Sequence, residues 1–297
     1  MGFGAWRLNA AGWKGIIIIG SEFATAGSGE VRAPGRGAAR ARRPMPIIAR
    51  GWSALAIGAF LALLLAARSL AAATQADLAA ERSRMVTTIK AHAKQASMAI
   101  GRDSIAPEIL KVLDEVPRHE FVPDDERGKA YADRPLPIGY GQTISQPFVV
   151  AVMTDLLRVR PDDSVLEVGT GSGYQAAVLA HLAHRVHTIE IVPGLADTAA
   201  ARLQRLGYDK VATRSADGYY GWEEAAPFDG IIVTAAASQI PPPLLRQLKP
   251  GGRMVIPVGA PFALQHLVLV ERNADSGRVT TRQLLPVHFV PLTGGDR

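Results

Sequence analysis

The sequence predicts an α/β fold, a doubly wound and mostly parallel sheet that is preceded by N-terminal helices. From residue 165 onward, short apolar runs rich in Val and Ile alternate with segments of helical periodicity. Uninterrupted apolar runs are typical of strands buried on both faces, and their alternation with helices is typical of β-α-β units. The first run, residues 165–168, also leads directly into a glycine-rich turn and a helical segment.

The elements follow in order along the chain. A helical pattern starts at Asp77, and a second short helix is predicted over residues 105–116, where Pro117 ends it. Pro135 to Pro147 is predicted to be a long loop, and loops of that length are often functional. The predicted strands are residues 165–168, 186–191, 211–215, 230–234, 254–258, 267–270 and 282–290, and the helices among them are residues 174–182, 193–206 and 243–248.

Two segments precede this predicted domain, which spans residues 77–297. Residues 1–44 are rich in Gly, Ala and Arg and predict a disordered extension. The alternatives are sequence upstream of a true start at Met45, or a basic arm for anionic lipid or nucleic acid. Residues 45–76 contain an uncharged run at 51–67, which predicts a signal peptide or membrane anchor. The alternatives are a hydrophobic helix packed on the domain, or a mistranslated upstream region.

The composition excludes several functions. The chain has no cysteine, so disulfide bonds and thiolate catalysis are excluded. Of its 33 basic and 27 acidic residues, the first 50 positions hold eight basic and two acidic ones. The remaining 25 basic and 25 acidic residues leave residues 51–297 with no net charge, so no nucleic-acid partner is expected.

The glycine-rich turn is the first sign of a cofactor. Gly169, Gly171 and Gly173 stand at alternate positions after the first strand. Glycine lets the backbone approach a nucleoside-bearing cofactor closely and adopt positive φ. The G-x-G-x-G spacing differs from the G-x-G-x-x-G of dinucleotide sites and resembles the S-adenosylmethionine (SAM) loop of class I methyltransferases, which have a Rossmann-like fold.

Two carboxylates are predicted at the ends of the next strands. Glu190 lies 21 residues after Gly169, where an acidic side chain can accept hydrogen bonds from ribose hydroxyls. Asp217 and Gly218 follow the third strand, and Asp217 there could hold an adenine amino group. A solvated carboxylate at Glu190 and an ordinary Asp-Gly turn are the structural alternatives.

Four blocks resemble the protein-L-isoaspartate O-methyltransferase family. They are residues 117–123 (Pro-Arg-His-Glu-Phe-Val-Pro), 139–147 (Gly-Tyr-Gly-Gln-Thr-Ile-Ser-Gln-Pro), 167–174 and 228–236. The closing residues 288–292 are also similar to the family's C-terminal end, and the resemblance covers about residues 80–295. One departure is Ala216 before Asp217, where the family usually has Gly.

The resemblance implies methyl transfer from SAM to the α-carboxylate of L-isoaspartyl residues in damaged proteins. It implies that Ser145 is the catalytic-loop residue, donating a hydrogen bond to that carboxylate or fixing the loop. A metal is not expected, because His181, His184 and His187 straddle a helix end and a strand. The residues expected to contact the cofactor are Thr143, Ile144, Gln146, Glu167, Gly169, Gly171, Gly173, Glu190, Asp217, Gly218 and Thr234.

Other functions remain open from the sequence. They are a SAM-dependent methyltransferase of RNA or a small molecule, a nicotinamide oxidoreductase, and a membrane-tethered, non-catalytic domain that binds damaged proteins. The family resemblance and the supply of SAM predict a cytoplasmic monomer. Residues 51–67 keep membrane association or export as the alternative, which would place the domain outside the cytoplasm.

Overall fold

The computed structural model of the protein describes residues 76–260 and 263–295. The predicted extension at 1–44 and the signal-peptide-like run at 51–67 lie outside these residues and remain predictions. Within the described part of the chain, no helix combines the length and the apolar character that a membrane span requires.

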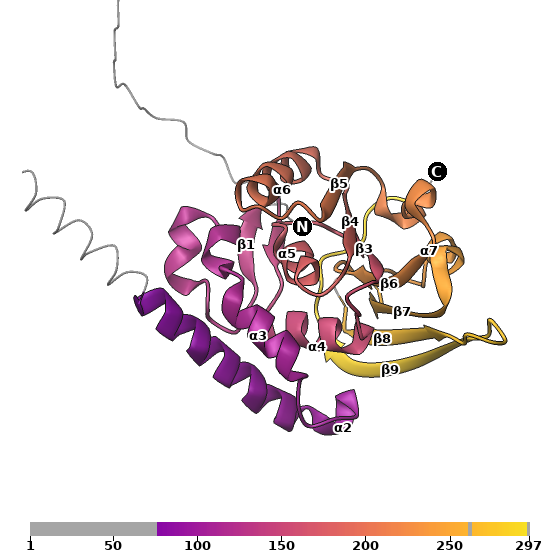
Figure 1. Ribbon diagram of the computed structural model, residues 1–297, viewed down its shortest axis with the longest axis horizontal. Coiled ribbons are helices and arrows are strands. Elements are labelled where there is room, and N and C mark those ends of the chain that lie inside the picture. The colour runs from indigo at the N-terminus through magenta and orange to yellow at the C-terminus, as the bar shows by residue number, and fades with distance from the viewer. Residues whose placement is uncertain (1–75, 261–262, 296–297) are drawn as a thin grey trace, which may run out of the picture. The chain divides into compact units, whose positions relative to one another are not determined.

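Seven strands form one sheet in the order β5-β4-β3-β6-β7-β8-β9 (Figure 1). Strands β3 to β7 pair in parallel, and β8 and β9 add antiparallel to β7. This confirms the predicted doubly wound, mostly parallel sheet. The strands are β3 Ser164–Val168, β4 Arg185–Glu190, β5 Val211–Ser215, β6 Phe228–Val233, β7 Leu248–Val258, β8 Gln265–Arg272 and β9 Val279–Val287.

The direction of winding reverses between β3 and β6. From β3 the chain adds β4 and β5 on one side, and it then returns to add β6 and β7 on the other. A reversal of this kind leaves a crevice at the carboxyl ends of the two central strands, because their following loops turn to opposite faces. The carboxyl end of β3 is where the glycine-rich turn begins.

Helices cover both faces of the sheet, and alternate strand residues belong to two separate cores. Val165 on β3 belongs to the core that includes α3, α4 and α5, whereas Leu166 and Val168 belong to the core that includes α7. Residues 76–95 are helical and lie beside α3 in Figure 1. The other helices are α2 Ser97–Ile100, α3 Pro107–Glu115, α4 Pro147–Leu157, α5 Tyr174–Ala180, α6 Pro193–Arg205 and α7 Pro242–Gln247.

The stretch predicted to be a long loop is partly ordered into regular structure. Strands β1 Leu136–Gly139 and β2 Gln142–Ile144 form a hairpin. Tyr140 and Gly141 both have positive φ, as two-residue type I′ turns require. Helix α4 begins directly after the hairpin at Pro147 and was not predicted, since nearly all its residues are buried and its sequence shows no amphipathic period.

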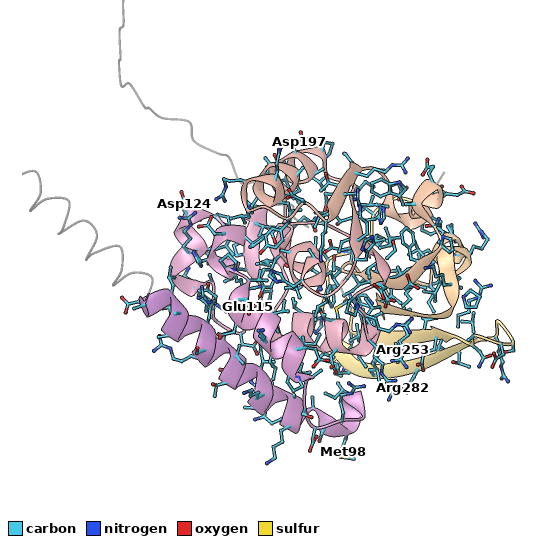
Figure 2. The ribbon with its side chains drawn as sticks, viewed as in Figure 1. Met98, Glu115, Asp124, Asp197, Arg253 and Arg282 are labelled. Carbon is cyan, nitrogen blue, oxygen red and sulfur yellow. The ribbon has the colours of Figure 1, made fainter. Side chains whose placement is uncertain are left out.

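Many charged side chains lie at the periphery of the domain. Asp124, Asp197 and Arg282, labelled in Figure 2, are exposed and belong to three separate parts of the fold. Acidic and basic groups are therefore distributed over different elements of the neutral domain. The polar groups at the carboxyl edge of the sheet are a local exception to this pattern, because several of them are buried.

Candidate active site

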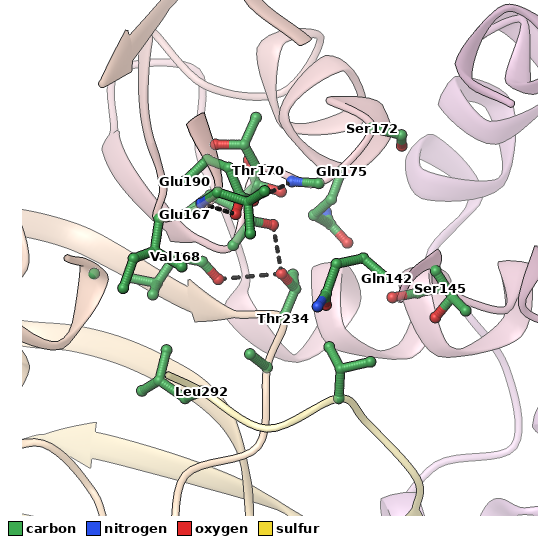
Figure 3. A pocket seen from close by; sticks show the side chains of 18 of the residues that line it. Gln142, Ser145, Glu167, Val168, Thr170, Ser172, Gln175, Glu190, Thr234 and Leu292 are labelled. Atoms are coloured by element: carbon green, nitrogen blue, oxygen red, sulfur yellow. Dashed lines mark hydrogen bonds between the residues drawn. The ribbon is translucent and has the colours of Figure 1, made fainter. Parts of the chain in front are cut away.

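A cavity of about 780 Å³, including its open mouth, lies at the carboxyl ends of β3, β4 and β6 (Figure 3). Of the residues predicted from the sequence, nine line this cavity, which we call the cofactor pocket. They are Thr143, Ile144, Ser145, Glu167, Gly169, Gly171, Glu190, Gly218 and Thr234.

The glycine-rich turn brings bare backbone to the wall of the cofactor pocket. Gly169 and Gly171 have φ values of 97° and 52°, in the left-handed region that favours glycine. A Cβ atom on Gly169 would lie 2.5 Å from the hydroxyl oxygen of Thr234. That hydroxyl donates to the carbonyl oxygen of Gly169 at 2.6 Å, so Thr234 at the end of β6 holds the turn against the sheet.

Glu190 ties the turn to the end of β4. Its Oε2 accepts from the backbone N–H of Gly171 at 2.8 Å, and its Oε1 accepts from the N–H of Val192 at 2.9 Å. The residue is buried but lines the cofactor pocket. A carboxylate offers about four lone-pair sites, so both oxygens retain acceptor capacity for a ligand.

Glu167 is the most deeply buried carboxyl group of the pocket. Its Oε2 accepts from the hydroxyl of Thr188 at 2.6 Å, and Thr170 donates in turn to Thr188, because the single Thr188 proton is already used. Its Oε1 has no hydrogen-bond partner among the residues that the structure describes. Desolvation by burial, reinforced by the nearby Glu190 charge and opposed by the Thr188 hydrogen bond, raises the pKa of Glu167 to about 8.

Ser145 lies between the end of β2 and the start of α4, and its backbone is anchored by a buried cation. Arg118 donates from Nη2 to the carbonyl oxygen of Ser145 and from Nε to that of Ala130, both at 2.8 Å. The guanidinium also lies 4.9 Å from the ring centroid of Tyr174. Burial lowers the pKa of Arg118 to about 10, so it remains a cation at neutral pH. The loop that carries Ser145 is therefore anchored through its backbone by a buried side chain.

Three predicted site residues do not line the cofactor pocket. Gly173 packs under the turn, where an added Cβ would lie 3.2 Å from Leu203. Gln146 donates to Asp133. Asp217 lines an adjoining hollow, where it accepts from the backbone N–H groups of residues 219 and 295. Ile191 lines both this hollow and the pocket, so the two are neighbours.

A second cavity, of about 1340 Å³, adjoins the cofactor pocket, and we call it the cleft. Its walls come from the helix at 76–95, the start of α4 and the C-terminal segment 285–290. Thr143, Ser145, Thr234 and Val290 line both cavities. Ser145 therefore stands at the junction between them, and Figure 3 shows it across the pocket from Glu190.

The sequence alone assigned no role to Arg118. It also assigned none to the C-terminal residues 290–293, which complete the wall of the cofactor pocket. Both belong to the blocks that resemble the family, which was the available signal. Their contacts depend on tertiary packing, because Arg118 reaches Ser145 across 27 positions of sequence. Among the described residues, no group of three or more His, Cys, Asp or Glu side chains could hold a metal ion.

A doubly wound sheet whose glycine-rich turn and strand-end carboxylates border one pocket defines the class I methyltransferase fold. A sequence profile described as protein-L-isoaspartate(D-aspartate) O-methyltransferase matches residues 94–297. The chain therefore belongs to this family, and it is an enzyme that uses SAM to methylate isoaspartyl residues of proteins.

Individual relatives agree with this assignment. Protein-L-isoaspartate O-methyltransferase 2 of Syntrophobacter fumaroxidans is 60% identical over 241 residues, which cover 80% of this chain and 97% of that protein. A solved protein-L-isoaspartate O-methyltransferase structure matches with a TM-score of 0.63 and 26% identity, covering 72% of this chain and 66% of that one. A Plasmodium falciparum structure of the same description, in complex with S-adenosyl-L-homocysteine, matches in fold with a TM-score of 0.60 and 23% identity, covering 71% and 98%.

Proposed function

We propose that the cofactor pocket holds SAM, that the cleft holds the isoaspartyl peptide, and that methyl transfer takes place beside Ser145. The observation that carries this proposal is the shared wall of the two cavities. Thr143, Ser145, Thr234 and Val290 border both, so a donor in one cavity and an acceptor in the other would meet there.

The cofactor contacts are proposed from the side chains around the pocket. Glu190, already aligned by two backbone N–H groups, accepts from the ribose hydroxyls. Gly169 and Gly171 allow the close approach of the amino-acid portion. The unpartnered oxygen of Glu167 supplies a polar group at the buried end of the pocket. Asp217 lies in the adjoining hollow, in support of its proposed contact with the adenine amino group.

The reaction needs alignment more than proton transfer. The cofactor supplies a methyl carbon that is already electrophilic, and the α-carboxylate of isoaspartate is ionised at neutral pH, so no general base is required. Ser145 donates a hydrogen bond that orients this carboxylate, and Arg118 holds the Ser145 backbone in place. The methyl ester then closes to a succinimide when the following amide nitrogen attacks it and methanol leaves. Hydrolysis of the succinimide, which gives partly aspartate, needs no enzyme group.

The remaining proposals concern where and how the enzyme works. A requirement for SAM supports action in the cytoplasm, with residues 51–67 as the segment that could tether or export the chain. The neutral domain supports a protein substrate over a nucleic acid. A folded catalytic domain over residues 77–297, acting as a monomer, is the simplest arrangement.

The test uses the full chain, labelled SAM and two peptides that differ only in L-isoaspartate or L-aspartate at one position. Base-labile label on the isoaspartyl peptide alone is the expected result. Label on neither peptide, with SAM binding intact, would assign the pocket to a methyltransferase of another substrate. Absence of SAM binding would refute the assignment of the cofactor pocket.

A further inference from the structure

The cleft has a wall of mixed apolar and polar side chains. Its lining residues include no Lys, Arg, Asp or Glu, and much of the wall is contributed by Phe148, Val149 and residues 285–290. The groups on this wall that can pair with the backbone of a bound peptide are seven polar side chains: His92, Gln95, Thr143, Ser145, Gln146, Thr234 and His288. Each polar side chain on the wall gains importance, because an unpaired backbone group is costly when buried.

His92 is a polar group of this wall that is held in a defined orientation. Its Nδ1 lies 2.5 Å from Oδ2 of Asp133, and its ring packs edge-on against Phe148 with centroids 5.7 Å apart. Asp133 is itself fixed, because its side chain is 5% exposed and it accepts from Gln146 and from the backbone N–H of Phe148. The imidazole is therefore oriented before any ligand binds.

The second ring nitrogen of His92 is available to a ligand. Nε2 makes no hydrogen bond to the residues that the structure describes, and His92 lines the cleft. With the Nδ1 proton donated to Asp133, a neutral ring presents Nε2 as an acceptor. A main-chain N–H of an extended peptide is a donor that such an oriented acceptor can bind.

We propose that His92, oriented by Asp133, accepts a hydrogen bond from a main-chain N–H of the substrate beside its isoaspartyl residue and so determines affinity for the peptide. The inference rests on the proposed function of the cleft. It assigns a substrate contact to the helix at residues 76–95, most of which precedes residue 94, where the match to the family begins.

A pair of substitutions separates this role from a structural one. His92→Asn keeps an N–H near the position of Nδ1 and so keeps the bond to Asp133, but it removes Nε2. His92→Gln places an amide oxygen near the position of Nε2. His184→Asn, at an exposed histidine before β4 and outside both cavities, is the matched control.

The experiment measures methylation of an isoaspartyl peptide by the wild type and by each variant. We expect His92→Asn to raise KM for the peptide roughly 3- to 10-fold, with kcat and the SAM dissociation constant unchanged. His92→Gln should recover part of the loss, and the control should match wild type. A set of peptides, each N-methylated at one flanking amide, then identifies the donor. The peptide that is methylated at the donor amide should have a raised KM with the wild type. Its KM should not rise further with His92→Asn, because the hydrogen bond is already absent.

Three results would overturn the inference. One is an unchanged KM in His92→Asn. Another is a joint change of KM, kcat and SAM affinity, which would mean that His92 only supports the Ser145 loop through Asp133 and Gln146. The third is that, for every N-methylated peptide, the effects on KM of the peptide's methylation and of His92→Asn add. Absence of methylation by wild type would instead refute the proposed function, so the two failures are distinguishable.

Discussion

Glu167→Gln tests the electrostatics of the cofactor pocket. Burial holds the pKa of Glu167 at about 8, against an ordinary value of 4.5. Between these two pH values the folded protein keeps the proton that the unfolded chain releases. The free energy of unfolding of the wild type therefore falls as pH rises through this window. A glutamine does not titrate, so the variant lacks this contribution.

The magnitude follows from the two pKa values. At about 1.36 kcal/mol per pH unit, the full difference corresponds to about 5 kcal/mol above pH 8 and to about 3 kcal/mol at pH 7. The substituted side chain has the same shape, and its amide oxygen can accept from Thr188 as Oε2 does. We therefore expect the variant without SAM to be more stable than wild type, and the difference to grow with pH.

The assay is denaturant unfolding of both proteins at about pH 5 and about pH 8. At each pH the free energy of unfolding of the wild type is subtracted from that of the variant, so that the contributions of groups common to both cancel. The advantage of the variant should be about 4 kcal/mol larger at the higher pH. Glu223→Gln, which removes one exposed carboxylate, controls for loss of charge alone. A difference between Glu167→Gln and wild type that is independent of pH would refute the reasoning.

The remaining predictions concern catalysis and cofactor binding. Ser145→Ala should lower turnover much more than SAM affinity, because Ser145 is proposed to contact the peptide carboxylate. Steady-state kinetics and calorimetry measure the two quantities, and an equal loss of both would refute that role. Glu190→Ala should weaken SAM binding by about 1–3 kcal/mol, the range for losing hydrogen bonds to a buried charged group, and an unchanged dissociation constant would refute the ribose contact. Gly169→Ala should abolish SAM binding and lower the melting temperature, because it strains a φ of 97° and clashes at 2.5 Å with the Thr234 hydroxyl; near-native binding would show that the turn adapts.

The local sequence was sufficient to predict the sheet and the glycine-rich turn. Residues 165–168 and the glycines that follow have few conformations open to them, since apolar β-branched runs favour buried strands and glycine tolerates positive φ. Helix α4 was missed for the complementary reason. Its buried residues leave no periodic pattern, and periodicity is the signal from which a helix is predicted.

The sequence by itself determined the fold class, the family and the residue types gathered at the carboxyl edge of the sheet. Only the tertiary structure decided how they are arranged. The contact of Arg118 with Ser145 and the pairing of His92 with Asp133 join residues 27 and 41 positions apart. The unpaired oxygen of Glu167 depends on burial from every side. These hydrogen bonds, the desolvation of Glu167 and the meeting of two cavities at Ser145 arise only when segments distant in sequence pack together. The spacing of residues along the chain therefore cannot predict them.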